Sequence, residues 1–350
     1  MSKYFYKDKP VVGLDISQTG LKIMAINPHK STVLGYGSLE VDPAKLQQSL
    51  DGDGEYLGEQ LKTLLDKKIV GHLPSNHTVM SIPTSRTYSR SISLPIDLKG
   101  DMLEAVRLEA EQFIPIPIDQ LYLDYEITQR TKDGVIAHTS AAPRRIVDTC
   151  MAAAAHAGLR TVLVEPSIHA IARVLRSSEQ GHLPTVIVDI TAASTDVAIL
   201  DGTIKVTGVV AVGGNTLTVE IADLLKVSME KAHQLKILSG LSQGPKQAKL
   251  QTAVKPTLDK ILSEVRKVVR YYEERVAGAQ KLEQVLILGS GSNMPGLGEY
   301  FTDHLMLASR VASPWQELDF GRLAQPARQH RPRYISVAGL ALVPPKEIWS

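Results

Sequence analysis

Two short segments place an aspartate at the end of an apolar run, directly before a turn of small and hydroxyl-bearing residues. The first reads Gly13-Leu14-Asp15-Ile16-Ser17-Gln18-Thr19, and the second reads Val188-Asp189-Ile190-Thr191-Ala192-Ala193-Ser194-Thr195. Such turns let several backbone N–H groups approach phosphate oxygens, and an aspartate at a strand end commonly holds Mg²⁺ through water. Either turn alone is typical of an ordinary hairpin. The pair, about half a chain apart, favours a duplicated phosphate-binding site.

Other residues add to this chemistry with less weight. Lys22 can neutralise phosphate charge as a point cation, and Leu288-Gly289-Ser290-Gly291-Ser292 lets a ligand approach the backbone closely. Gly213-Gly214-Asn215 either touches a phosphate or merely turns the chain into a helix, and the sequence leaves both readings open. Glu264 and Lys267 lie on a predicted helix and are more typical of a solvated charged face.

Several other sites are excluded by pattern or composition. The sequence has no Gly-x-x-x-x-Gly-Lys-Ser/Thr, no Gly-x-Gly-x-x-Gly opening a βαβ unit, and no His-Glu-x-x-His. A single cysteine, Cys150, excludes an internal disulfide and a thiolate metal cluster, and it fits a reducing compartment. The formal net charge is +2, so no broad nucleic-acid footprint is expected. We expect no membrane span and no signal peptide.

The aspartate turns need paired strands to position them. Val11–Ile16 and Leu21–Ile26 are predicted to form one hairpin, with Asp15 and Lys22 flanking its tip, and the second turn joins strands 185–190 and 194–200. Helices are expected over 44–68 and 258–277, and a loop rich in Gly, Gln and Lys over 240–255. A chain of 350 residues suits two domains.

A separate block interrupts the first of these domains. It is predicted to contain a strand over 86–94, a helix over 98–113 that Pro115 and Pro117 terminate, and paired strands over 121–130 and 135–141. This β-α-β-β order reads as an inserted subdomain. Glu165-Pro166 downstream is more typical of a plain helix start than of a ligand site.

The two aspartate hairpins, the Gly-Gly turn and the Gly-Ser-Gly loop resemble the phosphate-1, phosphate-2 and adenosine motifs of the actin-like ATPase superfamily. Within it, the resemblance is closer to the PilM family of type IV pilus assembly proteins, a family close to FtsA. The stretch Glu109-Ala110-Glu111-Gln112-Phe113-Ile114-Pro115-Ile116-Pro117-Ile118 resembles a hallmark of that family. So do Ala142-Pro143-Arg144-Arg145-Ile146-Val147-Asp148 and Tyr334-Ile335-Ser336-Val337-Ala338-Gly339-Leu340-Ala341-Leu342.

The resemblance implies an α/β, actin-like (ribonuclease H-like) duplicated fold with two lobes around a nucleotide cleft. Residues 1–84 and 143–180 would form the first lobe, 85–142 the inserted subdomain and 181–325 the second lobe. Residues 326–350 would return to the first lobe as a C-terminal helix. The role implied is a cytoplasmic scaffold of the inner-membrane assembly platform.

The resemblance also implies ligands and partners. ATP or ADP would be bound with Mg²⁺, which Asp15, Asp189 and Glu165 would hold through water. The N-terminal cytoplasmic tail of a PilN-like bitopic inner-membrane protein would dock on Phe113, Ile114, Pro115, Ile116 and Pro117. A PilO-like protein and the pilus motor ATPase would be reached indirectly, without nucleic acid. The nucleotide would contact Asp15, Ser17, Gln18, Thr19, Lys22, Thr191, Ala192, Ser194, Thr195, Gly213, Gly214, Asn215, Glu264, Lys267, Gly289, Ser290, Gly291 and Ser292.

The sequence departs from the family at three places where glycine is usual, namely Ser17, Thr191 and Ser290. A Cβ at each place narrows the space where backbone meets phosphate, although the hydroxyls can donate hydrogen bonds instead. Three readings therefore stay open: a nucleotide-responsive scaffold, a scaffold that has lost nucleotide, and a small-molecule kinase of the same superfamily. No residue stands out as the group that would activate water for ATP hydrolysis.

Overall fold

The computed structural model describes residues 10–27, 29–95, 101–130, 132, 134–179, 183–245, 247–276 and 278–348. The chain divides into two compact units. The first comprises Met1–Tyr88, Leu94–Glu179 and Pro314–Ser350, and the second comprises Ser89–Ser93 and Gln180–Ser313. The lobe boundaries expected from the sequence stay a prediction.

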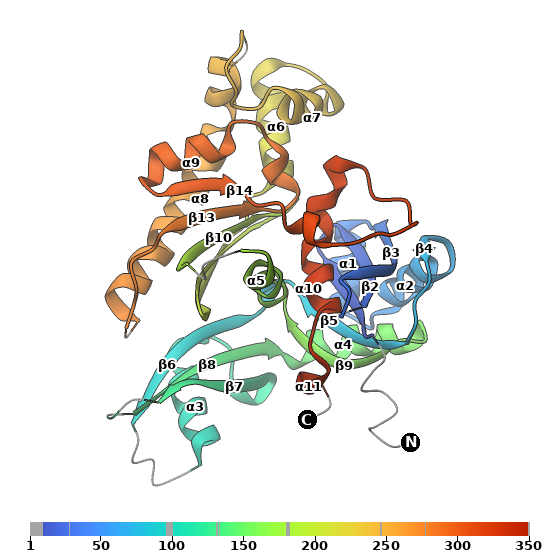
Figure 1. Cartoon of the computed structure of the whole chain (residues 1–350), viewed down its shortest axis with the longest axis vertical. Helices are drawn as coiled ribbons and strands as arrows, with labels where there is room; N and C mark the ends of the chain where they lie inside the picture. The colour runs from blue at the N-terminus through green and yellow to red at the C-terminus, as the bar shows by residue number, and fades with distance from the viewer. Residues whose placement is uncertain are drawn as a thin grey trace. The chain divides into compact units, whose positions relative to one another are not determined.

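A six-stranded sheet forms the centre of the first unit, with the order β4-β3-β2-β1-β5-β9 (Figure 1). Its strands are β1 (Val12–Ser17), β2 (Gly20–Asn27), β3 (Thr32–Glu40), β4 (Ile69–Gly71), β5 (His77–Ile82) and β9 (Arg160–Pro166). The predicted hairpin is confirmed, because β1 and β2 pair antiparallel with Asp15 directly opposite Lys22. Strand β5 runs parallel to β1 and carries Ser81 next to Asp15.

Helices cover the two faces of this sheet. Val12, Leu14 and Ile16 share a core with α1 (Pro43–Leu50), α2 (Glu55–Lys67) and α4 (Arg144–His156), as period-two alternation along a strand requires. Helix α5 (Ser167–Ser178) and helix α10 (Ile335–Ala341) pack against each other on the alternate residues Val11 and Val79. A Cβ at Gly339 would overlap the backbone of Ala170, so only glycine permits this close packing of α10 on α5.

The single helix predicted over 44–68 is wrong, because the chain breaks into α1 and α2. The break lies at Asp51-Gly52-Asp53-Gly54, where Gly54 adopts a left-handed φ of 80°. Glycine enters this region without a steric penalty, and the turn lets Leu57, Leu61 and Leu64 reach the same core as Leu46.

The block inserted in the first unit has the predicted β-α-β-β order. It contains β6 (Tyr88–Pro95), α3 (Met102–Glu111), β7 (Leu121–Arg130) and β8 (Gly134–Pro143), with a short 3-10 turn over Ile118–Gln120. The Asp101 side chain caps α3 by accepting a hydrogen bond from the Leu103 N–H at 3.0 Å. The predicted start of this helix, residues 98–100, lies outside the described residues. The small core of the inserted block contains Ala110, Ile114, Ile118, Leu121 and Ala141.

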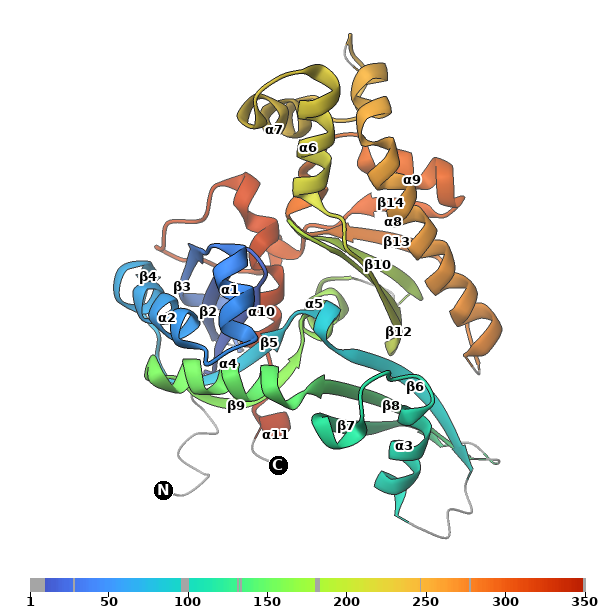
Figure 2. The same ribbon diagram turned by 180° about the vertical axis from the view of Figure 1, so that it is seen from behind.

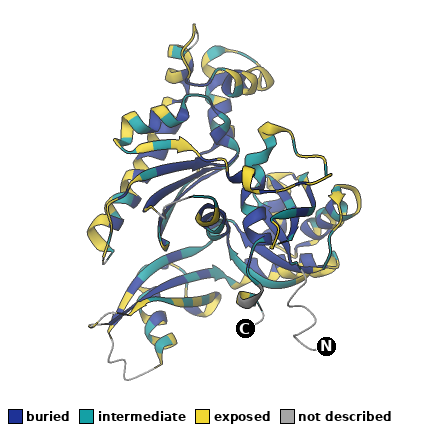
Figure 3. Cartoon of the chain, in the orientation of Figure 1, coloured by how far each residue is buried: buried dark blue, intermediate teal, exposed yellow. Residues whose placement is uncertain are grey.

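The second unit is built on β14 (Ala308–Val311), β13 (Gln284–Leu288), β10 (Thr185–Ile190), β11 (Thr195–Asp201) and β12 (Thr203–Val210), neighbours in that order. The Ser89–Ser93 part of β6 joins beyond β12, with Arg90 opposite Val206. Every residue of β10 is buried, and the strand is dark blue along its length in Figure 3. The hairpin predicted around the second aspartate turn is confirmed, since β10 and β11 pair antiparallel.

Four helices complete this unit among the described residues, and the longest corrects a prediction. They are α6 (Gly214–Leu225), α7 (Met229–Leu238), α8 (Gln247–Arg275) and α9 (Leu297–Leu305). The loop predicted over 240–255 is wrong from Gln247 onward, because α8 begins there and runs for 29 residues (Figure 2). The main core of the unit buries Leu250, Ala253 and Val254. This packing stabilises the helix despite the polar residues around them. No described helix is both long and apolar enough to cross a membrane.

Candidate functional site

The first aspartate turn holds its charged groups in a closed set of contacts. Asp15 is 4% exposed, and its carboxylate accepts from the Lys22 ammonium at 2.6 Å and from the Ser81 hydroxyl at 2.7 Å. Lys22 also donates to the Ser17 hydroxyl oxygen at 3.1 Å. The Ser17 hydroxyl in turn donates to the Gly20 carbonyl at 2.7 Å. Ser17 stands where the family usually has glycine, and its hydroxyl proton is directed to the backbone of its own turn. Gln18 and Thr19 complete the tip of that turn.

The second turn is closed in a similar way. The Thr191 hydroxyl donates to the Ser194 carbonyl at 2.8 Å and accepts from the Ser194 N–H at 3.1 Å. Thr195 is fully buried and donates to the Val212 carbonyl at 2.8 Å. Both hydroxyls thus fix the turn, and the hydrogen bonds they make are internal.

The start of helix α6 is bonded to this second turn. The Gly214 N–H donates to the Thr191 carbonyl and the Asn215 N–H donates to the Ala192 carbonyl, each at 2.8 Å. A Cβ on Gly213 would lie 2.6 Å from the Thr191 carbonyl oxygen, so this glycine is required by close packing. The structure therefore brings the second turn and the Gly-Gly turn together.

Asp196 joins this region and was missed by sequence reasoning. It lies directly opposite Asp189 across the antiparallel pair β10–β11, and the two residues are 4% and 7% exposed. Directly opposite residues have Cβ atoms roughly 4.5–5.5 Å apart, so two buried carboxyl groups are neighbours. The signal was available, because Asp196 follows Asp189 by the same seven positions as Lys22 follows Asp15.

Lys236 on α7 is the second missed residue. It is 4% exposed, and its ammonium donates to the Gly214 carbonyl at 2.6 Å and to the Thr218 hydroxyl at 2.7 Å. It places a buried positive charge beside the first turn of α6, where the helix dipole already favours an anion. A lysine on a polar helix is usually solvated, so nothing in the sequence marks this one.

Replacing Lys236 by methionine is expected to lower the free energy of unfolding by about 2 kcal/mol. Two hydrogen bonds to a charged donor are lost, and relief from burying the ammonium offsets part of that loss. Urea unfolding followed by circular dichroism measures the change. Lys231→Met, on the exposed face of the same helix, is the matched control and is expected within about 0.5 kcal/mol of wild type. Equal effects of the two variants would refute the prediction.

The Gly-Ser-Gly loop lies against both the second aspartate turn and the Gly-Gly turn. Gly289 has a φ of 81°, and a Cβ there would overlap Asp189 Oδ1 and the Ile190 carbonyl oxygen. A Cβ on Gly214 would lie 3.5 Å from Gly291 Cα, so the loop borders the start of α6. The Ser292 hydroxyl donates to the Gly289 carbonyl at 2.7 Å. The second turn, the Gly-Gly turn and this loop thus form one contiguous site within the second unit, in which Ser290 opens the loop's 3-10 turn.

Gly289→Ala is expected to destabilise the protein by about 1–3 kcal/mol through positive-φ strain and overlap with Asp189. Gly278→Ala is a sharp control, because Gly278 has a φ of 73° but nothing within 4 Å of its added Cβ. The difference in thermal unfolding midpoint between the two variants isolates the overlap from the backbone strain. A control variant as unstable as Gly289→Ala would contradict the packing argument.

Three predicted ligand residues have other contacts. Glu264 on α8 packs over Gly208 of β12 and pairs with the exposed Lys267 at 3.3 Å. Glu165 accepts from Arg173 at both carboxylate oxygens, at 2.7 and 2.8 Å. Their roles toward a nucleotide or a metal stay predictions. No group of three or more acidic, histidine or cysteine side chains suited to a metal ion occurs among the described residues.

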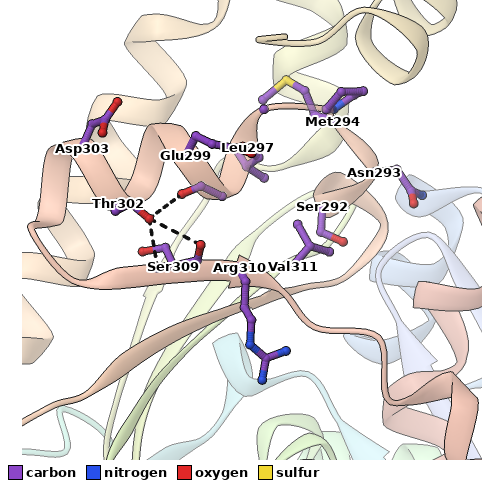
Figure 4. A pocket seen from close by; sticks show the side chains of 13 residues that line it. Ser292, Asn293, Met294, Leu297, Glu299, Thr302, Asp303, Ser309, Arg310 and Val311 are labelled. Atoms are coloured by element: carbon purple, nitrogen blue, oxygen red, sulfur yellow. Dashed lines mark hydrogen bonds between the residues drawn. The ribbon is translucent and has the colours of Figure 1, made fainter.

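Two surface hollows accompany these sites. One, of about 520 Å³, lies between α9 and the edge strand β14 and shares Ser292 with the predicted site (Figure 4). Thr302 covers this edge, because its hydroxyl accepts from the Ser309 N–H at 3.0 Å. The other, of about 530 Å³, lies on the inserted block between α3 and the chain over 114–119. It includes Ile114, Pro115, Ile116 and Pro117 of the predicted partner-binding set, whereas Phe113 packs against the block's core.

Comparison with known proteins identifies the family. A family model described as type IV pilus assembly protein PilM matches residues 13–344. The chain belongs to the PilM family of type IV pilus assembly proteins. A cell division protein FtsA from Borreliella burgdorferi is 20% identical over 353 residues, covering 95% of this chain and 74% of that protein.

Solved structures show the fold of this PilM-family chain. A structure described as the PilM-PilN type IV pilus biogenesis complex matches with a TM-score of 0.78 and 23% identity, covering 96% of this chain and 98% of that one. MreB5 of Spiroplasma citri bound to ADP matches with a TM-score of 0.51 and 14% identity, covering 95% of each chain. The predicted actin-like fold is therefore confirmed.

Proposed function

We propose that this PilM-family chain is a nucleotide-binding scaffold that docks the cytoplasmic tail of a PilN-like protein. The observation that carries the nucleotide part is the contiguous site of the second unit, where Gly214, Gly291 and the buried Lys236 meet at the start of α6. The ligand is ATP or ADP with Mg²⁺, and Asp189 is the carboxylate of this unit that would hold the metal through water. In support, an actin-like neighbour, MreB5, is described as bound to ADP.

Thermal unfolding with and without Mg-ATP tests the nucleotide proposal. Ligand at 100 times its dissociation constant adds roughly 2.7 kcal/mol to the free energy of unfolding. Gly289→Ala is expected to lose this gain. An unchanged midpoint for wild type at millimolar Mg-ATP would reject nucleotide binding.

A scaffold without nucleotide is the second candidate, and specific contacts favour it. The hydroxyls of Ser17 and Thr191 and the N–H groups of Gly214 and Asn215 are all bonded to backbone carbonyls. These donors would have to exchange partners before they could bind phosphate. The same thermal experiment separates the two candidates, because this one predicts no shift.

The docking part of the proposal rests on the likeness to the structure described as a PilM-PilN complex. The N-terminal tail of a PilN-like bitopic protein would bind the proline-bounded segment from Phe113 to Pro117 and hold the chain at the inner face of the membrane. A PilO-like protein and the motor ATPase would be reached through that partner. Calorimetry with the tail peptide is expected to give micromolar affinity, on the order of −8 kcal/mol. No heat and no binding would reject this part.

A further inference from the structure

A basic segment of the first unit takes no part in the sites described so far. Residues 322–333, from here called the arginine segment, contain Arg322, Arg328, Arg331 and Arg333. No aspartate or glutamate occurs in residues 320–346, although the whole chain has a formal net charge of only +2. The segment lies in the red loop beside β3 (Figure 1). Positive charge is therefore concentrated on one short stretch of this unit.

Buried aromatic rings anchor both ends of the arginine segment. Trp315, Phe320 and Tyr334 are 5%, 3% and 5% exposed, and the Trp315 ring stacks on that of Phe320 with centroids 4.9 Å apart. Tyr36 of β3 packs edge to face on Phe320 and on Tyr334. Its hydroxyl donates to the Ala324 carbonyl. A stretch with this much charge and so few apolar residues would stay disordered without such anchors.

Two of the arginines keep their whole charge available to a partner. Arg322 and Arg328 are exposed, and neither forms an ion pair or a side-chain hydrogen bond with another residue that the structure describes. The carboxylate of Asp319, just before the segment, accepts from the Gly321 N–H at 2.8 Å. These two guanidinium groups can therefore exchange water for an anion without breaking a contact within the protein.

The other two arginines are held only loosely. Arg333 pairs with Glu40 at 2.9 Å, but the two side chains are 38% and 83% exposed, and an exposed pair of this kind contributes little to stability. Arg331 donates from Nε to the Pro326 carbonyl at 3.2 Å, which uses only one of the N–H groups of its guanidinium. The segment thus presents four guanidinium groups on an anchored backbone.

We infer that the arginine segment binds the anionic phospholipid headgroups of a membrane surface. A guanidinium group pairs with phosphate oxygens in a fixed, two-pronged geometry. Each arginine close to an anionic leaflet strengthens binding roughly fivefold. The inference goes beyond the proposed docking of a tail peptide, because the lipid contact is made by the first unit itself and needs no tail.

The composition of the segment favours a lipid surface over an acidic protein. Residues 324–333 are alanine, glutamine, proline, arginine and histidine, with no large apolar or aromatic side chain among them. A specific protein interface usually has an apolar or aromatic centre that supplies most of its binding energy. Attraction to a charged headgroup layer needs no such centre.

Co-sedimentation of the full chain with vesicles at low ionic strength tests this inference. The chain is expected to bind vesicles of equal parts phosphatidylglycerol and phosphatidylcholine, and not vesicles of phosphatidylcholine alone. Arg322→Gln/Arg328→Gln is expected to lose at least about tenfold in affinity while keeping the wild-type unfolding midpoint, since both side chains are exposed. Arg275→Gln/Lys281→Gln removes two exposed positive charges from the second unit and is the matched control, expected to bind like wild type.

The outcomes decide between the lipid, an acidic protein and overall charge. Equal losses for the two double variants would assign any binding to overall charge and overturn the inference, as would equal binding to the two kinds of vesicle. Labelled polyglutamate probes the acidic-protein alternative. If Arg322→Gln/Arg328→Gln weakens polyglutamate binding but leaves vesicle binding unchanged, the segment recognises an acidic protein and the inference is wrong. Each of these results leaves the docking proposal intact, because no tail peptide is present.

Discussion

Replacing Arg173 by methionine is expected to lower the free energy of unfolding by about 3–5 kcal/mol, the range found when one partner of a buried ion pair is removed. The guanidinium is 16% exposed and donates to both carboxylate oxygens of Glu165, at 2.7 and 2.8 Å. It also donates to the Gly339 carbonyl at 3.0 Å. One side chain of helix α5 thus joins strand β9 and helix α10.

The charge on Arg173 is secured by its partners. Burial lowers the pKa of the guanidinium, but the hydrogen bond and charge of Glu165, with a smaller contribution from Glu347, raise it above its usual value. In the methionine variant the Glu165 carboxylate, 12% exposed, keeps its burial and loses its counter-charge. Most of the expected loss comes from that stranded carboxylate.

Two comparison variants make this prediction sharp. Glu165→Gln/Arg173→Met removes both charges and is expected to be more stable than Arg173→Met alone, as a double-mutant cycle in urea would show. Arg145→Met breaks an exposed pair with Asp51, whose side chains are 64% and 44% exposed, and is expected to cost less than about 1 kcal/mol. Equal losses for Arg173→Met and Arg145→Met would contradict the buried-pair argument.

Glu165 also illustrates what sequence can and cannot assign. The Glu-Pro pair correctly indicated a helix start, since α5 begins at Ser167, directly after Pro166. The partner of the carboxylate lies on the facing helix eight residues later, and no local pattern identifies it. To hold Mg²⁺ through water, the Glu165 carboxylate would have to bind that water beside Arg173 or release its hydrogen bonds to Arg173.

The hairpins were predictable because their signals are local. Period-two alternation, small turn residues and one aspartate at each strand end define β1–β2 and β10–β11. The start of α8 was not predictable, because Gln247 to Lys255 reads as polar and only the packing of Leu250 and Val254 in the core reveals the helix. The residues Asp51-Gly52-Asp53-Gly54 do indicate a turn between α1 and α2. The helical periodicity on both sides of them favoured one continuous helix instead.

The glycine replacements show the limit of inference from residue type. A hydroxyl at Ser17 or Thr191 can in principle donate to a phosphate, as the sequence suggests. In the structure each hydroxyl donates to a carbonyl of its own turn, Gly20 or Ser194. The direction of a hydroxyl depends on backbone atoms three residues away, which composition does not encode.

Acidification is expected to lower the free energy of unfolding by roughly 3 kcal/mol between pH 6.5 and pH 4 through His169 alone. Burial, together with the positive charges of Arg173 and Arg176, lowers the pKa of this imidazole from 6.5 to about 4. The unfolded chain takes up a proton near pH 6.5 while the folded chain does not. Stability is therefore full above that pH and is lost as pH falls toward 4.

The surroundings of His169 explain why the folded state resists the proton. Its Nε2 atom is buried and has no hydrogen-bond partner within the described residues. Its ring lies 5.2 Å, centroid to centroid, from that of His138 on β8. The contact joins helix α5 to the inserted block, so charging His169 would strain the attachment of that block to the first unit's helices.

Urea unfolding of His169→Leu at pH 7.5, 5.5 and 4.5 measures this contribution. The variant is expected to lose less stability than wild type as pH falls, by roughly 3 kcal/mol at the lowest pH. His72→Gln removes an exposed histidine and is expected to keep the wild-type dependence on pH. Arg173→Met removes one of the charges that lower the pKa of His169, so it is expected to shrink the acid loss while lowering stability at neutral pH. Parallel pH curves for wild type and His169→Leu would show that this imidazole is not the group responsible.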